Sequence, residues 1–220
     1  MDKVVLIIGS ETLLGRKLIE LSLNKGYKVI APVMTSQEKL KESSKKTLQI
    51  IPWNRSSVIS SKTVIRESLR AFGKIDSVLF VHPDVKINDN LQDTSIEMIE
   101  ETLNTLLHGS IYLIKELLGY FIREEKGSIA FAETEKAHQT VSPLTNLISG
   151  GFHSFSDSIL QSLLPGIYKC AFTTKITEMD DYAEFILNIL SSSDDRADGE
   201  WLKFTEKKGI FQSLPIIKRK

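Results

Sequence analysis

Several ionisable side chains follow apolar segments of this sequence, at positions that suit acid/base chemistry or metal binding. His82 comes directly after the apolar segment 75–81, and Glu133 comes directly after the segment 128–132, with His138 a little further along. Histidine and carboxylate groups transfer protons and bind divalent metals. These residues lack the short ligand spacing of a metal motif, so we expect no metal site. A metal or an acid/base pair at this place stays a secondary hypothesis.

A second candidate site is the turn after the first apolar run, Ile8-Gly9-Ser10-Glu11-Thr12-Leu13-Leu14-Gly15-Arg16. Gly9 suits a tight turn, and Gly15 allows the helix after it to pack closely on the preceding strand. Backbone amides at a helix N-terminus favour a diphosphate. The turn therefore predicts a phosphate-binding loop.

Apolar runs alternate with amphipathic segments along the chain, and this alternation indicates which elements position those residues. Continuous apolar runs are typical of strands buried on both faces, whereas apolar residues three and four apart indicate helices. We expect strands at 4–8, 27–33, 48–51, 75–81, 128–132, 167–173 and 201–204, helices at 13–24, 56–72, 95–125, 144–164 and 180–190, and a helix or loop at 38–46.

Strands that alternate with helices predict parallel strands joined by helical crossovers. We therefore expect an α/β fold: a doubly wound, seven-stranded parallel sheet of the Rossmann type with helices on both faces. No linker or repeat divides the chain, so residues 1–220 are predicted to form a single domain. Such sheets bind ligands at the carboxyl ends of their strands, where the strand order reverses.

Composition and charge exclude several classes of protein. The chain has 28 basic and 28 acidic residues, which argues against a nucleic-acid binder, because such proteins carry a basic excess. No apolar run reaches the roughly 20 residues of a membrane span. The single cysteine, Cys170, cannot form an internal disulfide. We expect a cytoplasmic protein with neither nucleic-acid nor membrane partners.

Three segments, 74–81, 127–132 and 199–204, together with the turn 9–15, carry a resemblance to one protein family. They are similar to the fourth, fifth and last strands and to the first turn of the short-chain dehydrogenase/reductase family. The resemblance implies a dinucleotide-binding fold with NAD or NADP as the cofactor. It places the following residues in the cofactor site: Gly9, Ser10, Leu14, Gly15 and His82.

The chain departs from the family around this cofactor site. The family's first turn has three glycines; Gly9 and Gly15 match the first and third, but the middle position is Leu13 or Thr12, depending on the spacing used. A side chain there occupies space in which the family's backbone approaches a phosphate. The family's Asn-Asn-Ala-Gly motif is replaced by Val81-His82-Pro83-Asp84. We therefore expect dinucleotide binding, if retained, to be weak.

The family's catalytic positions also carry other residues. The resemblance places Asn146 at the catalytic tyrosine and Gly150 at the lysine that lowers the pKa of that tyrosine. An amide cannot act as a phenolate, and glycine carries no charge. The serine position falls at Thr134, or at Glu133 with a different loop spacing, and the asparagine position falls at Leu106. No tyrosine–lysine pair is intact.

The segment that covers the substrate in the family is also missing. Family members usually carry an insertion after the sixth strand, whereas residues 173–177 lead almost directly to the last helix. A site without such a cover does not exclude water from a hydride transfer.

These departures lead to a first hypothesis of a non-catalytic member that acts as a binding or assembly partner. The alternative is a divergent NAD(P)-dependent oxidoreductase, with Thr134 polarising a carbonyl and water or a histidine supplying the proton. A third is a sensor that binds a nucleotide without turnover. The resemblance further implies a homodimer or homotetramer formed through the helices at 95–125 and 144–164, or a mixed oligomer with an active relative.

Overall fold

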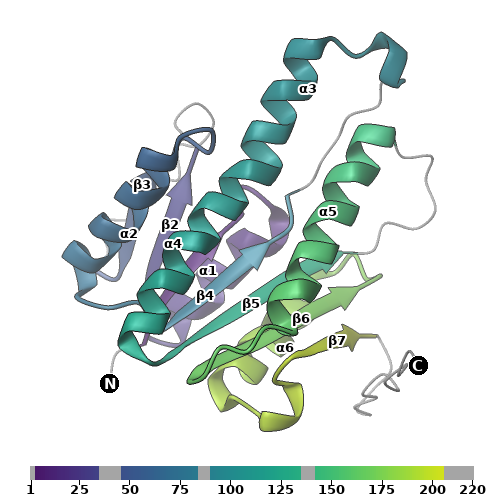
Figure 1. Cartoon of the computed structure of the whole chain (residues 1–220). Coiled ribbons are helices and arrows are strands. Elements are labelled where there is room, and N and C mark those ends of the chain that lie inside the picture. The colour runs from purple at the N-terminus through teal and green to yellow at the C-terminus, as the bar shows by residue number, and fades with distance from the viewer. Residues whose placement is uncertain (1–2, 35–45, 84–89, 135–141, 206–220) are drawn as a thin grey trace.

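The structure is a computed structural model that describes residues 3–34, 46–83, 90–134 and 142–205, and a parallel sheet forms its centre (Figure 1). All neighbouring strands pair in parallel, in the order β3-β2-β1-β4-β5-β6-β7. This confirms the predicted doubly wound, seven-stranded α/β fold. The strands are β1 (Val4–Ile8), β2 (Lys28–Val33), β3 (Leu48–Pro52), β4 (Ser77–Val81), β5 (Gly127–Thr134), β6 (Ile167–Thr174) and β7 (Glu200–Phe204).

Helices cover both faces of the sheet (Figure 1). Buried side chains divide into one large core against α2, α4 and α5 and another against α1 and α6. Alternate residues of the central strands enter opposite cores, which is why these strands are apolar throughout. The helices are α1 (Leu13–Asn24), α2 (Val58–Phe72), α3 (Ile96–Thr102), α4 (Gly109–Glu124), α5 (Pro143–Leu160) and α6 (Met179–Ser192), with short turns η1 (Leu91–Asp93) and η3 (Asp195–Ala197). None of these described helices is long and apolar enough to cross a membrane.

The predicted helical stretch over 95–125 is confirmed, but its middle is not α-helical. The π-helical segment η2 (Leu103–His108) separates α3 from α4. A π turn widens the helix and changes the phase of the side chains that follow it. Leu103 and Leu106 consequently pack against α5, whereas the apolar residues of α4 face the sheet. The predicted helix or loop at 38–46 lies almost wholly outside the described residues.

The stretch α3–η2–α4, called the long helix below, continues beyond the carboxyl edge of the sheet, and so does α5 (Figure 1). There Leu144 and Ile148 of α5 form a small separate core with Leu103, Leu106 and Ile99. These two helices therefore border the region beyond the strand ends, which is where ligands of doubly wound sheets bind. The connection from β6 to α6 is short, residues 175–178, as the sequence predicts.

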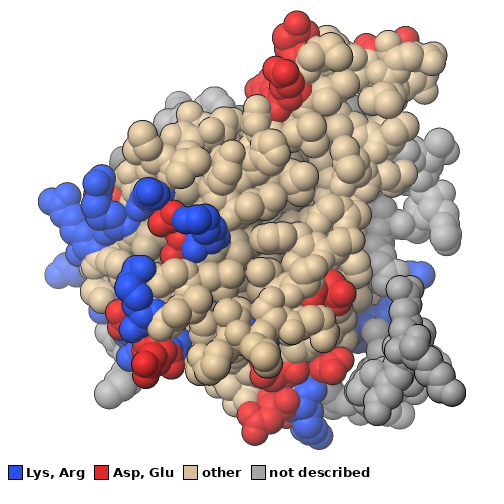
Figure 2. All heavy atoms as spheres, viewed as in Figure 1, with Lys and Arg blue, Asp and Glu red and all other residues tan. Residues whose placement is uncertain are grey.

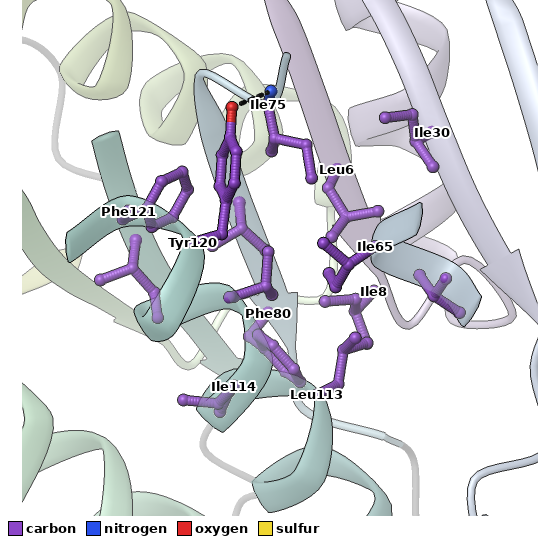
Figure 3. Packing of buried hydrophobic residues seen from close by; sticks show 14 of the residues in the cluster. Leu6, Ile8, Ile30, Ile65, Ile75, Phe80, Leu113, Ile114, Tyr120 and Phe121 are labelled. Atoms are coloured by element: carbon purple, nitrogen blue, oxygen red, sulfur yellow. Dashed lines mark hydrogen bonds between the residues drawn. The ribbon is translucent and has the colours of Figure 1, made fainter. Parts of the chain in front are cut away.

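Helix α4 lies on the sheet through large apolar side chains (Figure 3). Leu113 and Phe121 are fully buried, and both belong to the same core as Phe80 of β4. Tyr120 is also buried, and its hydroxyl accepts a hydrogen bond from the Ile75 N–H at 3.2 Å. This hydrogen bond satisfies the phenol inside the core, so Tyr120 has a structural role.

The start of α4 approaches the loop between β3 and α2 very closely. A Cβ atom on Gly109 would lie 2.6 Å from the Arg55 carbonyl oxygen, too close for any side chain. A Cβ atom on Gly119, in the same helix, would meet only an Arg123 guanidinium nitrogen at 3.7 Å. The two glycines form a matched pair for testing this contact.

We expect Gly109→Ala to lower the free energy of unfolding by about 1–3 kcal/mol, because the helix must move away from the loop. Gly119→Ala should leave stability unchanged or raise it by up to about 1 kcal/mol, because alanine favours a helix. Urea unfolding followed by circular dichroism measures both changes. Equal changes in the two variants would contradict the close contact.

Candidate functional site

The candidate site lies at the carboxyl edge of the sheet, where the strand order reverses between β1 and β4. The turn from β1 to α1 lies beside the end of β4. Gly9 has φ +90°, and a Cβ atom there would lie 2.7 Å from the Val81 carbonyl oxygen. A Cβ atom on Gly15 would lie 2.0 Å from the Gly9 carbonyl oxygen. Both positions therefore require glycine, for the reasons that the sequence suggests.

Thr12, one of the two residues at the missing middle glycine, is the N-cap of α1. Its hydroxyl accepts a hydrogen bond from the Gly15 N–H at 2.9 Å and donates one to the Gly9 carbonyl at 2.8 Å. The Thr12 N–H also donates to the Gly9 carbonyl. Among the described residues, no acceptor bonds the N–H groups of Leu13 and Leu14. Two amide donors at the N-terminus of α1 thus stay open to an anion.

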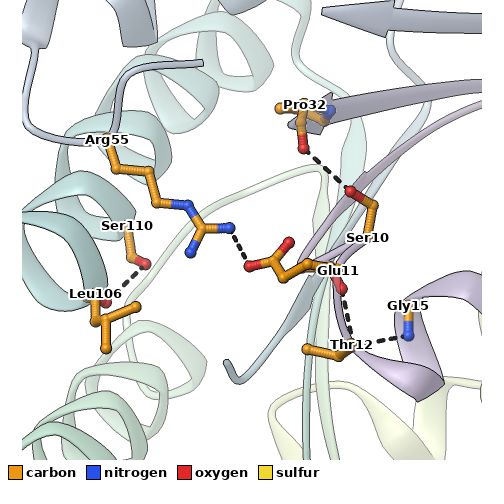
Figure 4. Close-up of polar contacts among 9 residues, drawn as sticks. Ser10, Glu11, Thr12, Gly15, Pro32, Arg55, Leu106 and Ser110 are labelled. Atoms are coloured by element: carbon orange, nitrogen blue, oxygen red, sulfur yellow. Dashed lines mark hydrogen bonds and ion pairs between the residues drawn. The ribbon is translucent and has the colours of Figure 1, made fainter. Parts of the chain in front are cut away.

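Ser10 belongs to the turn but directs its hydroxyl into the protein. It is fully buried, and its hydroxyl donates a hydrogen bond to the Pro32 carbonyl at 3.3 Å (Figure 4). This contact joins the first turn to β2. The predicted contact between Ser10 and a cofactor is therefore limited to its backbone.

The first turn is also joined to the loop after β3, through an ion pair that the sequence analysis missed. The Arg55 guanidinium points toward the Glu11 carboxylate and bonds to it (Figure 4). Arg55 is 5% exposed, and its guanidinium carbon lies 5.0 Å from the centre of the Trp53 ring. No described residue bonds its buried Nε. Glu11 and Arg55 are far apart in the sequence, so no local motif reveals the pair.

The positions equivalent to the family's catalytic residues do not form one hydrogen-bonded cluster. Leu106 lies in η2 and packs against α5, where it belongs to the small apolar core. Thr134 is exposed at the end of β5, and Asn146 is exposed on α5. Gly150 is exposed as well, and a Cβ atom built on it would meet no atom of the described residues within 4 Å. His82 packs its ring against the edge of Phe152, with ring centres 4.8 Å apart.

A histidine–glutamate pair at the end of β5 is the second feature that sequence reasoning did not find. His153 of α5 and Glu133 approach each other at 3.0 Å between Nδ1 and Oε1. The His153 ring stacks on Trp201 of β7, with ring centres 4.4 Å apart. Asn146, Gly150 and His153 share one face of a helix by their spacing, which is the only sequence signal for this pair.

Two further tyrosines, the buried Tyr182 and the half-buried Tyr168, are held by structural contacts. The Tyr182 hydroxyl donates to the Glu133 carbonyl at 3.0 Å, and the Tyr168 hydroxyl donates to the Asp194 carbonyl at 3.3 Å. Burial raises the pKa of both phenols well above the ordinary value. Burial likewise raises the pKa of the Cys170 thiol. These groups stay protonated near neutral pH, so they are poor bases and nucleophiles.

The secondary metal hypothesis gains no support from the part of the chain that the structure describes. No group of three histidine, cysteine, aspartate or glutamate side chains there is arranged to hold a metal ion. His138, one member of the hypothetical set, lies outside the described residues.

Comparison with known proteins identifies the class. The family model for short chain dehydrogenases matches residues 3–146, so this chain belongs to the short-chain dehydrogenase family. Comparison of the sequence with proteins of curated function gives no match.

Three solved structures show a similar fold. A short chain dehydrogenase from Bacillus anthracis is 16% identical, with a TM-score of 0.78 over 96% of this chain and 98% of that one. A 3-ketoacyl-(acyl-carrier-protein) reductase from Brucella melitensis, complexed with NADH, is 16% identical, with a TM-score of 0.77 over 91% and 96%. The L-sorbose reductase from Gluconobacter frateurii, complexed with NADPH and L-sorbose, is 13% identical, with a TM-score of 0.78 over 92% and 95%.

The Glu11–Arg55 pair gives a direct test of how the first turn is held. We expect Glu11→Gln to lower the free energy of unfolding by about 2 kcal/mol, because a buried guanidinium loses its counter-charge. The control is Glu20→Gln, since Glu20 is 62% exposed and lies 3.7 Å from Lys17. That substitution should change stability by less than about 0.5 kcal/mol. If urea unfolding gives the same value for both variants, the ion pair does not hold the turn.

Proposed function

We propose that this protein is a divergent NAD(P)-dependent oxidoreductase that reduces a carbonyl compound. The observation that carries the proposal is the first turn, where two obligatory glycines and two unbonded amide groups face the place of a diphosphate. Membership of the short-chain dehydrogenase family favours this hypothesis over the non-catalytic one. The dinucleotides in the similar Brucella and Gluconobacter structures support it.

The residues of the turn fit a dinucleotide diphosphate. Gly9 and Gly15 allow the tight turn, and the amides of Leu13 and Leu14 offer hydrogen bonds to phosphate oxygens. Glu11 is the one unfavourable charge, and Arg55 neutralises it. His82, which follows the end of β4, remains a predicted cofactor neighbour. A reduced nicotinamide dinucleotide would supply a hydride here.

The chemistry in this proposal differs from that of the family. Asn146 and Gly150, at the tyrosine and lysine positions, have no group that exchanges a proton near neutral pH. We propose that the hydroxyl of Thr134 polarises the substrate carbonyl and that another group supplies the proton.

The non-catalytic hypothesis remains the second candidate function. The observation that favours it is at Gly150, since no described side chain lies within 4 Å of a Cβ atom there to take the place of the family's lysine. In that case the protein binds a partner, or senses a nucleotide, without turnover. Its cytoplasmic location stays a prediction.

We also propose that two copies pair across α4 and α5. Figure 2 shows a broad surface over these helices with few charged side chains, while Lys and Arg gather toward α2. Some apolar residues of these helices are not available for this interface, because Leu113, Leu117 and Phe152 are buried in the core. The remaining candidates are Ile111, Leu118, Phe155, Ile159 and Leu163. A mixed oligomer with an active relative is the alternative assembly.

Titration with NADH and NADPH tests the proposed function. We expect at least one of them to bind and to raise the melting temperature, since a ligand at 100 times its Kd adds about 2.7 kcal/mol. Leu13→Gly should tighten binding by about tenfold, because it opens the space for the diphosphate. Intrinsic fluorescence and thermal unfolding measure the two effects. If neither dinucleotide binds at millimolar concentration, the oxidoreductase and nucleotide-sensor hypotheses both fail.

Restoring the family's pair tests whether the scaffold still supports the reaction. The double variant Asn146→Tyr/Gly150→Lys places both side chains on an exposed helix face with space around position 150. We expect it to reduce carbonyl compounds at least about 100-fold faster than the wild type, the usual effect of general acid/base catalysis. Asn146→Phe/Gly150→Lys, which lacks the hydroxyl, is the control. Equal rates for the two double variants would show that the scaffold no longer positions substrate and cofactor.

A further inference from the structure

We propose that His153 supplies the proton in the reduction of the carbonyl and that Glu133 positions its ring. This inference rests on the proposed oxidoreductase function and names the group that the function lacks. It places the acid on α5, one helical turn beyond Gly150, in place of a tyrosine. Glu133 is the positioning residue.

The contacts of His153 hold its ring from two sides. Its Nδ1 donates to Glu133 Oε1 at 3.0 Å, and its ring stacks on the Trp201 indole at an interplanar angle of 25°. The Glu133 side chain is 17% exposed, and the Tyr182 hydroxyl bonds the Glu133 carbonyl. A carboxylate on Nδ1 fixes the orientation of an imidazole and directs Nε2 away from it.

The opposite nitrogen of the ring is open to a substrate. The His153 side chain is 50% exposed, and no described residue bonds its Nε2. Because Nδ1 is bonded to Glu133, Nε2 is the nitrogen that exchanges a proton with substrate or solvent. The ring therefore has the arrangement of a general acid: one nitrogen held by a carboxylate and the other accessible.

Glu133 and His153 are close in sequence to the residues that the resemblance matches to the family's catalytic positions. Glu133 directly precedes Thr134, the predicted serine position, at the end of β5. His153 follows Asn146 and Gly150 on the same helix face. No atom of the described residues lies within 4 Å of a Cβ atom built on Gly150, which lies between Asn146 and His153 on this face.

The proposed step balances as follows. A hydride from the reduced dinucleotide forms the new C–H bond at the carbonyl carbon, and the carbonyl π electrons move to oxygen. The Nε2–H bond of the His153 imidazolium breaks, and its proton forms the O–H bond. The products are an alcohol, the oxidised dinucleotide and a neutral imidazole, which regains a proton from solvent at its exposed edge.

Histidine modification tests the placement without relying on activity. Diethyl pyrocarbonate, followed by mass spectrometry, should modify His153 and His108 in the protein alone. His108 is a matched control, because its Nδ1 is likewise bonded at 2.9 Å, to Asn104. A saturating amount of whichever dinucleotide binds should slow modification of His153 at least about fivefold and leave His108 unchanged. Equal rates for His153 with and without the dinucleotide would overturn the placement.

Kinetics of variants test the chemical role. With NADH or NADPH and a panel comprising a 3-oxoacyl thioester, a ketose and an aromatic aldehyde, we expect His153→Gln to lower kcat at least about 100-fold. Its Kd for the dinucleotide should stay within about twofold, and His108→Gln should leave both values unchanged. Glu133→Gln should lower kcat about tenfold with little change in KM, and Glu133→Asp should recover part of that loss.

The outcomes separate this inference from the proposed function. If the wild type and His153→Gln reduce the panel at equal rates, the oxidoreductase function stands and the role of His153 is wrong. If the dinucleotide binds but no member of the panel is reduced, both fail and the non-catalytic hypothesis replaces them. If Glu133→Gln alters only the melting temperature and not kcat, Glu133 is structural and does not position the ring.

Discussion

The close approach of the first turn to its surroundings is the constraint on which the candidate site depends. Gly15 lies so near the Gly9 carbonyl, and Gly9 so near Val81, that neither tolerates a Cβ atom. This packing draws the N-terminus of α1 against the ends of β1 and β4, where the strand order reverses. Amide donors and the ends of the central strands consequently meet at one edge, which is what a dinucleotide site requires.

Two contacts across the fold hold this turn in place. The buried Ser10 hydroxyl joins it to β2, and the Glu11–Arg55 pair joins it to the loop after β3. The same loop is packed by the start of α4 at Gly109. The position of the turn is thus linked through Arg55 to the long helix that borders the site.

Much of the architecture follows from local patterns in the sequence. The run Val4–Ile8 is apolar at every position, and a strand of this kind belongs in a sheet covered on both faces. Gly9 and Gly15 indicate a tight strand–helix turn, because they lie between this apolar run and a segment of helical periodicity. The π-helical segment η2 could not be predicted from these patterns. The apolar periodicity on either side of it is helical, and a π turn changes only the phase of the side chains that follow it.

The candidate site likewise has features that the sequence predicts and features that it does not. The sequence by itself determined the sheet and the glycine turn, because these depend on periodicity and on backbone freedom. That Asn146 and Gly150 stand at the family's tyrosine and lysine positions stays a prediction from the resemblance. Only the tertiary structure decided that Glu11 meets Arg55 and that Glu133 meets His153. Each pair joins residues from different elements. Their distance is set by how helices pack on the sheet, and no local pattern encodes it.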